Sequence, residues 1–131
     1  MRSAARILLA VLFVIAGANH LRDPAFYLAM MPTWVPAPEA MNLLVGVAEA
    51  LGGIGMLNVR TRRAAGWGLL LLLLAVFPAN IGMAQQPGRE PWANIPTWVL
   101  WARLPLQGVL MVWVWWVAVS RSANPGSAPR P

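Results

Sequence analysis

Hydrophobic residues are gathered into four long runs along this chain, and the stretches between the runs hold most of the prolines and charges. The runs extend from about Ala4 to Leu21, Ala40 to Asn58, Arg63 to Ala84 and Trp98 to Ala118. A helix of about 20 apolar residues crosses a bilayer core about 30 Å thick, so each run is long enough to be a membrane span. The pattern predicts an all-α membrane protein, a four-transmembrane-helix antiparallel bundle.

A shorter apolar segment lies between the first two runs. Asp23-Pro24 has the order of a helix cap followed by a first-turn proline. The stretch Phe26–Met31 that follows is too short to cross a bilayer, and Pro32 comes directly after it. We expect a short interfacial helix between transmembrane helices 1 and 2, which either covers the outer end of the bundle or is only an apolar connector.

Arginine placement predicts the orientation of the bundle. With four crossings, most of the arginines fall on one side of the membrane, namely Arg2, Arg6, Arg60, Arg62, Arg63, Arg121 and Arg130. Only Arg22 and Arg89 fall on the other side. Positive charge accumulates in cytoplasmic loops, so both termini are predicted to be cytoplasmic. A cleaved signal peptide ending near Ala18 is the alternative for the first run, but it would leave the remaining arginines on inconsistent sides.

The composition supports the membrane assignment. The chain has 131 residues, of which 59% are hydrophobic and 11% are charged, whereas soluble domains carry about 25% charged residues. The formal net charge of +6 therefore indicates the lipid bilayer, and not nucleic acid, as the partner. Arginine without lysine, together with abundant alanine, glycine and proline, is typical of GC-rich bacteria and favours the bacterial inner membrane. We assign residues 1–121 to the transmembrane domain and residues 122–131 to a disordered cytoplasmic tail.

Each of the four apolar runs contains polar side chains, either within the run or at its end. They are Asn19, His20, Glu49, Asn80, Arg103 and Gln107. A helical rise of about 1.5 Å per residue places all of them in the outer half of the membrane, and the inner half has none. Ionisable groups at this depth are costly and mark a binding site or a packing lock. We predict that the six side chains converge in an outward-opening polar pocket, with Glu49 paired directly to Arg103.

Helical spacing and two prolines point to the same pocket. One stripe along the second run carries Asn42, Gly46, Glu49 and Gly53, and its small residues permit close helix contact. Pro78 removes the hydrogen bond to the carbonyl of Leu74, and Pro105 does the same to Trp101. Each proline is therefore expected to expose a backbone acceptor near the polar cluster.

Several kinds of chemistry are excluded by residue type. His20 is the sole histidine and the chain has no cysteine, so zinc sites of several histidines or thiolates, two-histidine haem ligation and iron–sulfur clusters are not expected. No Ser-His-acid arrangement or glycine-rich phosphate loop is visible. We expect no metal site, no catalytic residues and no autonomous enzyme activity.

A set of short motifs resembles the DoxX-like family of small four-helix membrane proteins between Gly17 and Trp113. The motifs are His20 with Arg22-Asp23-Pro24 and Phe26, Met31-Pro32, Trp34-Val35-Pro36, Gly46-Val47-Ala48-Glu49 followed by Gly52-Gly53, Phe77-Pro78-Ala79-Asn80, and Arg103-Leu104-Pro105-Leu106-Gln107. Val45 stands where many relatives have a serine. The family's members include small subunits of quinone-linked thiosulfate oxidation and of oxidative-stress complexes, so the resemblance implies the fold more than an activity.

These observations favour a DoxX-like integral membrane protein whose outer-leaflet pocket binds a small amphipathic molecule or stabilises a partner membrane protein. One alternative is an accessory subunit of a quinone-linked redox complex, in which the quinone is the only cofactor considered and its head group would meet the polar cluster. A second alternative is a small-molecule transporter, which would need a polar path through the apolar inner half. A third is a membrane assembly factor.

Overall fold

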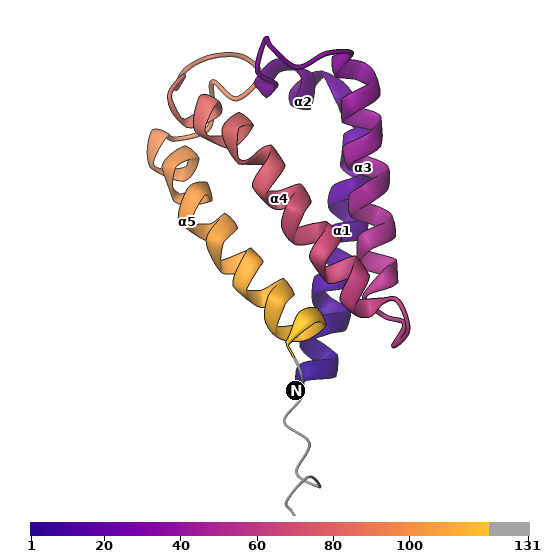
Figure 1. Cartoon of the computed structure of the whole chain (residues 1–131). Coiled ribbons are helices and arrows are strands. Elements are labelled where there is room, and N and C mark those ends of the chain that lie inside the picture. Colours follow the sequence, from indigo (N-terminus) through magenta and orange to yellow (C-terminus); the bar gives the residue numbers. More distant parts are fainter. Residues whose placement is uncertain (121–131) are drawn as a thin grey trace, which may run out of the picture.

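The described part of the chain is helical throughout. The computed structural model describes residues 1–120, so the expected tail at 122–131 lies outside it. It contains α1 (Arg2–Arg22), α2 (Pro24–Met30), α3 (Pro38–Gly55), α4 (Arg62–Ala84), α5 (Thr97–Val114) and the π-helical turn η1 (Trp115–Val119) (Figure 1). No strand forms within residues 1–120, which confirms the predicted all-α class.

Three helical segments are long and apolar enough to cross a membrane. They are α1, α4 and the continuous segment Thr97–Val119 formed by α5 and η1. Of the 18 most apolar consecutive residues in α1, only 22% are buried within the protein, and the share is the same in α4. In the third segment the share is 28%. Helices that expose this much apolar surface need a lipid environment, so the chain is a membrane protein. α3 has 18 residues, but it carries Glu39, Asn42 and Glu49 and is not among these three segments.

α1 and α3 lie side by side in close contact (Figure 1). A Cβ atom added to Gly17 would lie 2.5 Å from the carbonyl oxygen of Gly46, and one added to Gly53 would lie 2.8 Å from that of Ala10. A Cβ atom on Gly46 would likewise meet the Cβ atom of His20 at 2.7 Å. The two backbones therefore touch at the predicted small-residue stripe, which brings His20 against α3.

Two apolar clusters stabilise the two ends of the bundle. The cluster at the end where the chain begins contains Leu9, Ala10, Phe13, Met56, Leu69, Leu73, Val114, Val117, Ala118 and Val119. The cluster at the other end, beneath the long loops, contains Met83, Ala84, Trp92 and Leu100. The ribbons of α4 and α5 approach α1 near η1 and diverge from α1 and α3 toward α2 (Figure 1). The polar side chains described below lie between the two clusters.

Arginines from the first turns of α1 hold the two ends of the described chain together. Arg2 donates hydrogen bonds to the carbonyl oxygen of Trp116 and, at 2.7 Å, to the hydroxyl of Ser120. Arg6 Nε donates to the carbonyl oxygen of Val117 at 3.0 Å. The last carbonyls of a helix have no backbone partner within it. Arg6 thus satisfies the Val117 carbonyl, and the Trp116 carbonyl accepts from both Arg2 and the Ser120 hydroxyl.

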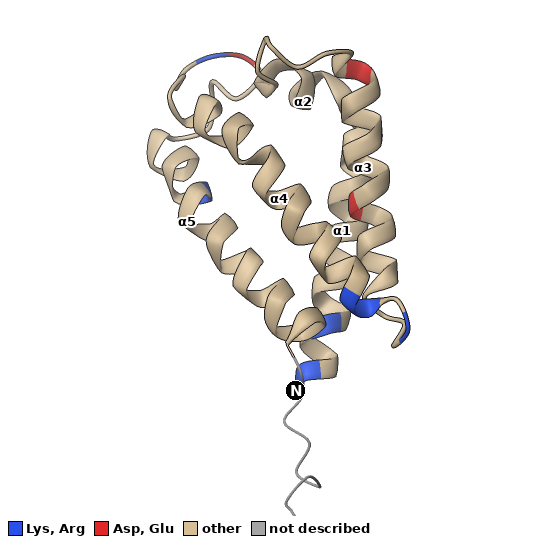
Figure 2. Ribbon diagram, viewed as in Figure 1, with Lys and Arg blue, Asp and Glu red and all other residues tan. Residues whose placement is uncertain are grey.

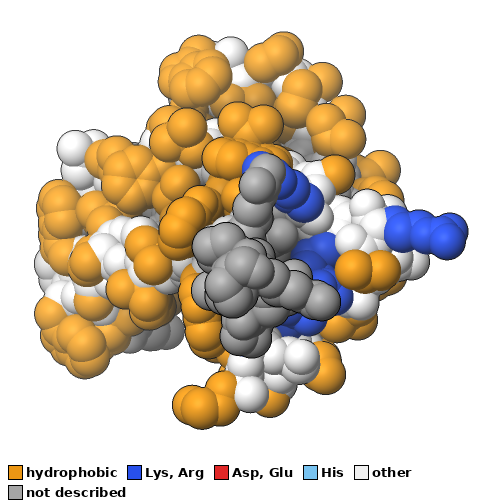
Figure 3. All heavy atoms as spheres, turned by 60° about the horizontal axis from the view of Figure 1, so that its bottom comes forward, with side chains coloured by type: hydrophobic (Ala, Val, Ile, Leu, Met, Phe, Trp, Pro, Cys, Tyr) orange, Lys and Arg blue, Asp and Glu red, His pale blue; other side chains and the backbone are white. Residues whose placement is uncertain are grey.

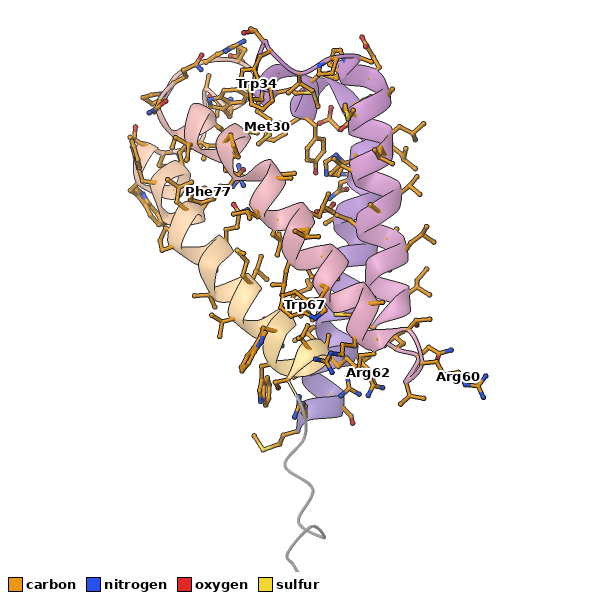
Figure 4. The ribbon with its side chains drawn as sticks, viewed as in Figure 1. Met30, Trp34, Arg60, Arg62, Trp67 and Phe77 are labelled. Carbon is orange, nitrogen blue, oxygen red and sulfur yellow. The ribbon has the colours of Figure 1, made fainter. Side chains whose placement is uncertain are left out.

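Basic residues gather at this end of the protein, and acidic residues do not. Blue segments mark the beginnings of α1 and α4 in Figure 2, and Figure 3 shows the arginine side chains beside an extensive apolar surface. Arg62 Nε donates to the carbonyl oxygen of Met56 at 3.0 Å, whereas Arg60 extends away from the body of the protein (Figure 4). Among residues 1–120 this end is therefore strongly positive.

Candidate functional site

The first wall of the site forms where α1 ends against α3. His20 is the fourth residue before Pro24, and a proline has no N–H to complete the helical hydrogen bond to the His20 carbonyl oxygen. Asn42 of α3 replaces that donor, because its Nδ2 donates to the His20 carbonyl oxygen at 3.0 Å. The Oδ1 atom of the same amide lies 2.7 Å from His20 Nδ1. The proline after α1 thus creates the position that Asn42 fills.

The orientation of the Asn42 amide assigns the proton on the imidazole. Since Nδ2 is used as the donor to a carbonyl, Oδ1 is the acceptor and His20 Nδ1 carries a hydrogen. His20 Nε2 then faces Glu49 Oε2 at 3.2 Å. The carboxylate of Glu49 is thus paired with the imidazole of His20, which bears a charge only when Nε2 is protonated.

α2 covers this wall with an aromatic ring. The ring of Tyr27 stacks on the His20 imidazole, with centroids 3.7 Å apart and an interplanar angle of 21°. Phe26 meets Tyr27 and Trp92 edge to face, which ties α2 to the loop between α4 and α5. The short helix predicted between the first two apolar runs is thus present in the structure and supplies part of the site.

The second wall belongs to α4 and α5. Asn80 Nδ2 donates to Gln107 Oε1 at 2.7 Å, and Gln107 Nε2 donates to the carbonyl oxygen of Leu73. Arg103 approaches Asn80 Oδ1 at 3.4 Å and Met83 Sδ at 2.7 Å. These contacts join the two helices beside their internal prolines.

The backbone acceptor on this wall differs from the predicted one by a single residue. Removal of an N–H by Pro78 was expected to free the carbonyl of Leu74, yet Gln107 binds the carbonyl of Leu73. A proline ring also displaces the preceding turn of a helix, which gives the amide access to the neighbouring carbonyl.

A cavity of about 220 Å³ separates the two walls. It is lined by His20, Tyr27, Met30, Val45, Glu49, Leu73, Val76, Asn80, Arg103, Leu106, Gln107 and Leu110. A carboxylate and an imidazole face it from one side, a guanidinium and two amides face it from the other, and the remaining lining is apolar apart from Tyr27. Within residues 1–120 no three His, Cys, Asp or Glu side chains are grouped as a metal site requires.

Comparison with known families identifies the group to which this chain belongs. The sequence model of a domain of unknown function, DUF8561, matches residues 9–118. The chain belongs to the DUF8561 family. The matched range begins in α1 and ends in η1, so it includes both walls of the cavity. Searches of curated proteins and of solved structures give no match.

The predicted ion pair between Glu49 and Arg103 is wrong for this DUF8561 chain. The salt bridge that forms within the described residues joins Glu49 to His20. Close packing of α1 on α3 brings the imidazole to the carboxylate, whereas the cavity separates Glu49 from α5. Sequence spacing placed Glu49 and Arg103 at similar depths, but depth does not fix the lateral distance between two helices.

The structure places five of the six predicted residues on the cavity lining and leaves one outside. Asn19 does not line the cavity, because successive residues of an α-helix point about 100° apart and His20 already faces α3. Three other contributors of the DUF8561 site were not assigned to it from the sequence, namely Tyr27, Asn42 and Met83. Asn42 had a detectable signal, since it lies on the same stripe as Glu49.

Titration of Tyr27 tests the enclosed character of the DUF8561 cavity. Burial raises the pKa of the Tyr27 hydroxyl, because the phenolate loses contact with water. Tyr27 is the only tyrosine, so ultraviolet absorbance reports its phenolate alone. We expect the phenolate to appear at a higher pH than in free tyrosine. Met30→Ala, which opens the lining beside it, should move the titration back toward the ordinary range, and an ordinary value in the unaltered protein would contradict the burial.

Proposed function

We propose that this protein is a DoxX-like inner-membrane protein of bacteria with four antiparallel crossings and cytoplasmic termini. The fourth crossing in this proposal is α3, which packs along α1. Its exposed side chains are almost all apolar, including Leu43, Leu44, Val47, Leu51 and Ile54. Its polar residues Asn42 and Glu49 are buried. The positive end, at which both ends of the described chain lie, supports a cytoplasmic location for that end.

We further propose that the cavity binds the polar head of a small amphipathic molecule. The observation that carries this proposal is the presence of Glu49 and Arg103 on opposite walls of one cavity without contact between them. Pockets for whole drug-sized ligands measure about 300–1,000 Å³, so a cavity of about 220 Å³ suits a head group with a few carbons. The rest of the molecule would remain in the lipid.

The position of the cavity favours binding over transport. The apolar cluster around Leu9, Phe13 and Val114 lies between the cavity and the positive end of the protein. A polar solute that crossed this layer would lose its hydrogen bonds without replacement. The proposed site is therefore a pocket open toward the outer leaflet, with an apolar floor.

Obstruction of the cavity provides the test. Val76 lines the cavity, and Leu74 on the same helix is 60% exposed, so Val76→Trp and Leu74→Trp form a matched pair. Each variant is purified from native membranes in mild detergent, and the extracted small molecules are identified by mass spectrometry. We expect an amphipathic species that is enriched with the unaltered protein and with Leu74→Trp, and depleted about tenfold with Val76→Trp, a loss of about 1.4 kcal/mol.

Two further results would decide the question. Thermal unfolding of both variants establishes that Val76→Trp is folded. Equal recovery of every extracted molecule from folded Val76→Trp and Leu74→Trp would contradict binding in the cavity.

A further inference from the structure

The positive charge of Arg103 has no acidic partner in the described chain. Its side-chain contacts are Met83 Sδ at 2.7 Å and Asn80 Oδ1 at 3.4 Å. A thioether is a weak acceptor, and a guanidinium has five N–H donors. A cation at membrane depth costs at least about 2.5–3.5 kcal/mol on insertion scales. Arg103 thus lines the cavity as an uncompensated charge with unused donors.

The opposite wall does not neutralise this charge. Glu49 is already paired with His20, and the two side chains are only 12% and 11% exposed. Asn80 and Gln107 are neutral amides that hydrogen-bond to each other. Among the described residues that line the cavity, Arg103 is therefore the charged side chain without an oppositely charged partner in contact.

We propose that the bound molecule is an amphiphile with a single carboxylate head, which pairs with Arg103. This inference rests on the proposed binding function and specifies its ligand. A planar carboxylate accepts two parallel hydrogen bonds from a guanidinium, and its one negative charge balances that of Arg103. A neutral quinone or ester leaves Arg103 uncompensated, and a phosphate monoester carries about −1.5 to −2 charges.

The lining also indicates where the hydrocarbon chain leaves the cavity. Leu106 lines the cavity and is 57% exposed on the outer surface of α5. Val45, Val76 and Leu110 supply further apolar lining. The carboxylate end is held at Arg103, and the chain passes Leu106 into the surrounding lipid.

The test compares head groups on similar chains. The purified full-length protein is placed in phosphatidylcholine nanodiscs at alkaline pH, with empty nanodiscs as the control for partition into lipid. Dodecanoate, methyl dodecanoate, dodecyl phosphate and decylubiquinone compete with radiolabelled dodecanoate. We expect dodecanoate to bind at least about tenfold more tightly than each of the other three.

Two arginine variants locate the preference. Arg103→Gln should lower dodecanoate affinity to that of the methyl ester, while Arg89→Gln, whose guanidinium contacts Gln86 in a loop, should leave it unchanged. Equal or tighter binding of the ester or of decylubiquinone by the unaltered protein would overturn the carboxylate assignment but leave the cavity as a binding site. Tighter binding of dodecyl phosphate would overturn it in favour of a more highly charged head.

Failure of the proposed function has a different signature. If no probe binds, the carboxylate inference fails. The proposed binding function itself fails only if, in addition, extraction from native membranes recovers no molecule that Val76→Trp depletes. The comparison of probes on the unaltered protein does not depend on whether Arg103→Gln folds.

Discussion

Gly17→Ala is expected to lower the thermal unfolding midpoint of the purified protein more than any other alanine substitution at a helical glycine. The new Cβ atom would lie 2.5 Å from the Gly46 carbonyl oxygen and 2.8 Å from the Ala50 backbone nitrogen. Backbone atoms cannot rotate away as a side chain can, so α1 and α3 must separate. Overpacking of this kind costs about 1–3 kcal/mol. The separation also draws His20 away from Asn42. Differential scanning fluorimetry in detergent measures the effect.

Gly68→Ala is the matched control for this prediction. Gly68 lies inside α4, and a Cβ atom added there meets nothing within 4 Å. Alanine has a higher helix propensity than glycine by about 1 kcal/mol, so the control should be unchanged or slightly more stable. Equal destabilisation by Gly17→Ala and Gly68→Ala would contradict a close backbone contact between α1 and α3.

His20→Ala is expected to have the largest effect among the polar residues. The substitution leaves the buried carboxylate of Glu49 without its ionic partner and Asn42 Oδ1 without its donor. Removal of one partner from a buried charged pair costs about 3–5 kcal/mol. We expect a large fall in the unfolding midpoint and in the yield of monodisperse protein, measured by fluorimetry and size-exclusion chromatography.

Glu49→Gln separates the loss of a hydrogen bond from the loss of charge. Asn42 already fixes the imidazole with a hydrogen on Nδ1, so Nε2 can accept a hydrogen bond from the glutamine amide. This variant should therefore be much more stable than His20→Ala. Equal instability of Glu49→Gln and His20→Ala would contradict this assignment of the imidazole hydrogen.

Much of the local structure could be predicted from short sequence patterns. Pro24 after Asp23 predicts the start of a short helix, and α2 begins at Pro24. The length of the apolar runs predicts α1, α4 and α5, and the most apolar residues of these helices remain largely exposed. These features depend on chain geometry and on transfer of side chains from water, both of which act within one segment. The π-helical turn η1 at the end of the last segment was not predicted, and its carbonyl oxygens accept hydrogen bonds from arginines of α1.

The polar pairing could not be predicted in the same way. Helical rise gives the depth of Glu49 and of Arg103 but not which neighbouring helix each side chain faces. Packing at Gly17 and Gly46 decides that His20, not Arg103, reaches the carboxylate. Tyr27 reaches the site because α2 places its ring on the imidazole of His20 in α1. Its position next to Phe26 in the sequence does not reveal this contact.

Sequence alone determined that this protein is helical, that it needs lipid, and that six polar side chains from four apolar runs lie in one half of its length. These properties follow from hydrophobicity and from the fixed rise of a helix, which require no knowledge of neighbours. Tertiary structure alone decided which of those side chains pair and which remain open to a cavity. The physical reason is that ionic and hydrogen bonds act over a few ångströms, and only helix packing sets distances on that scale.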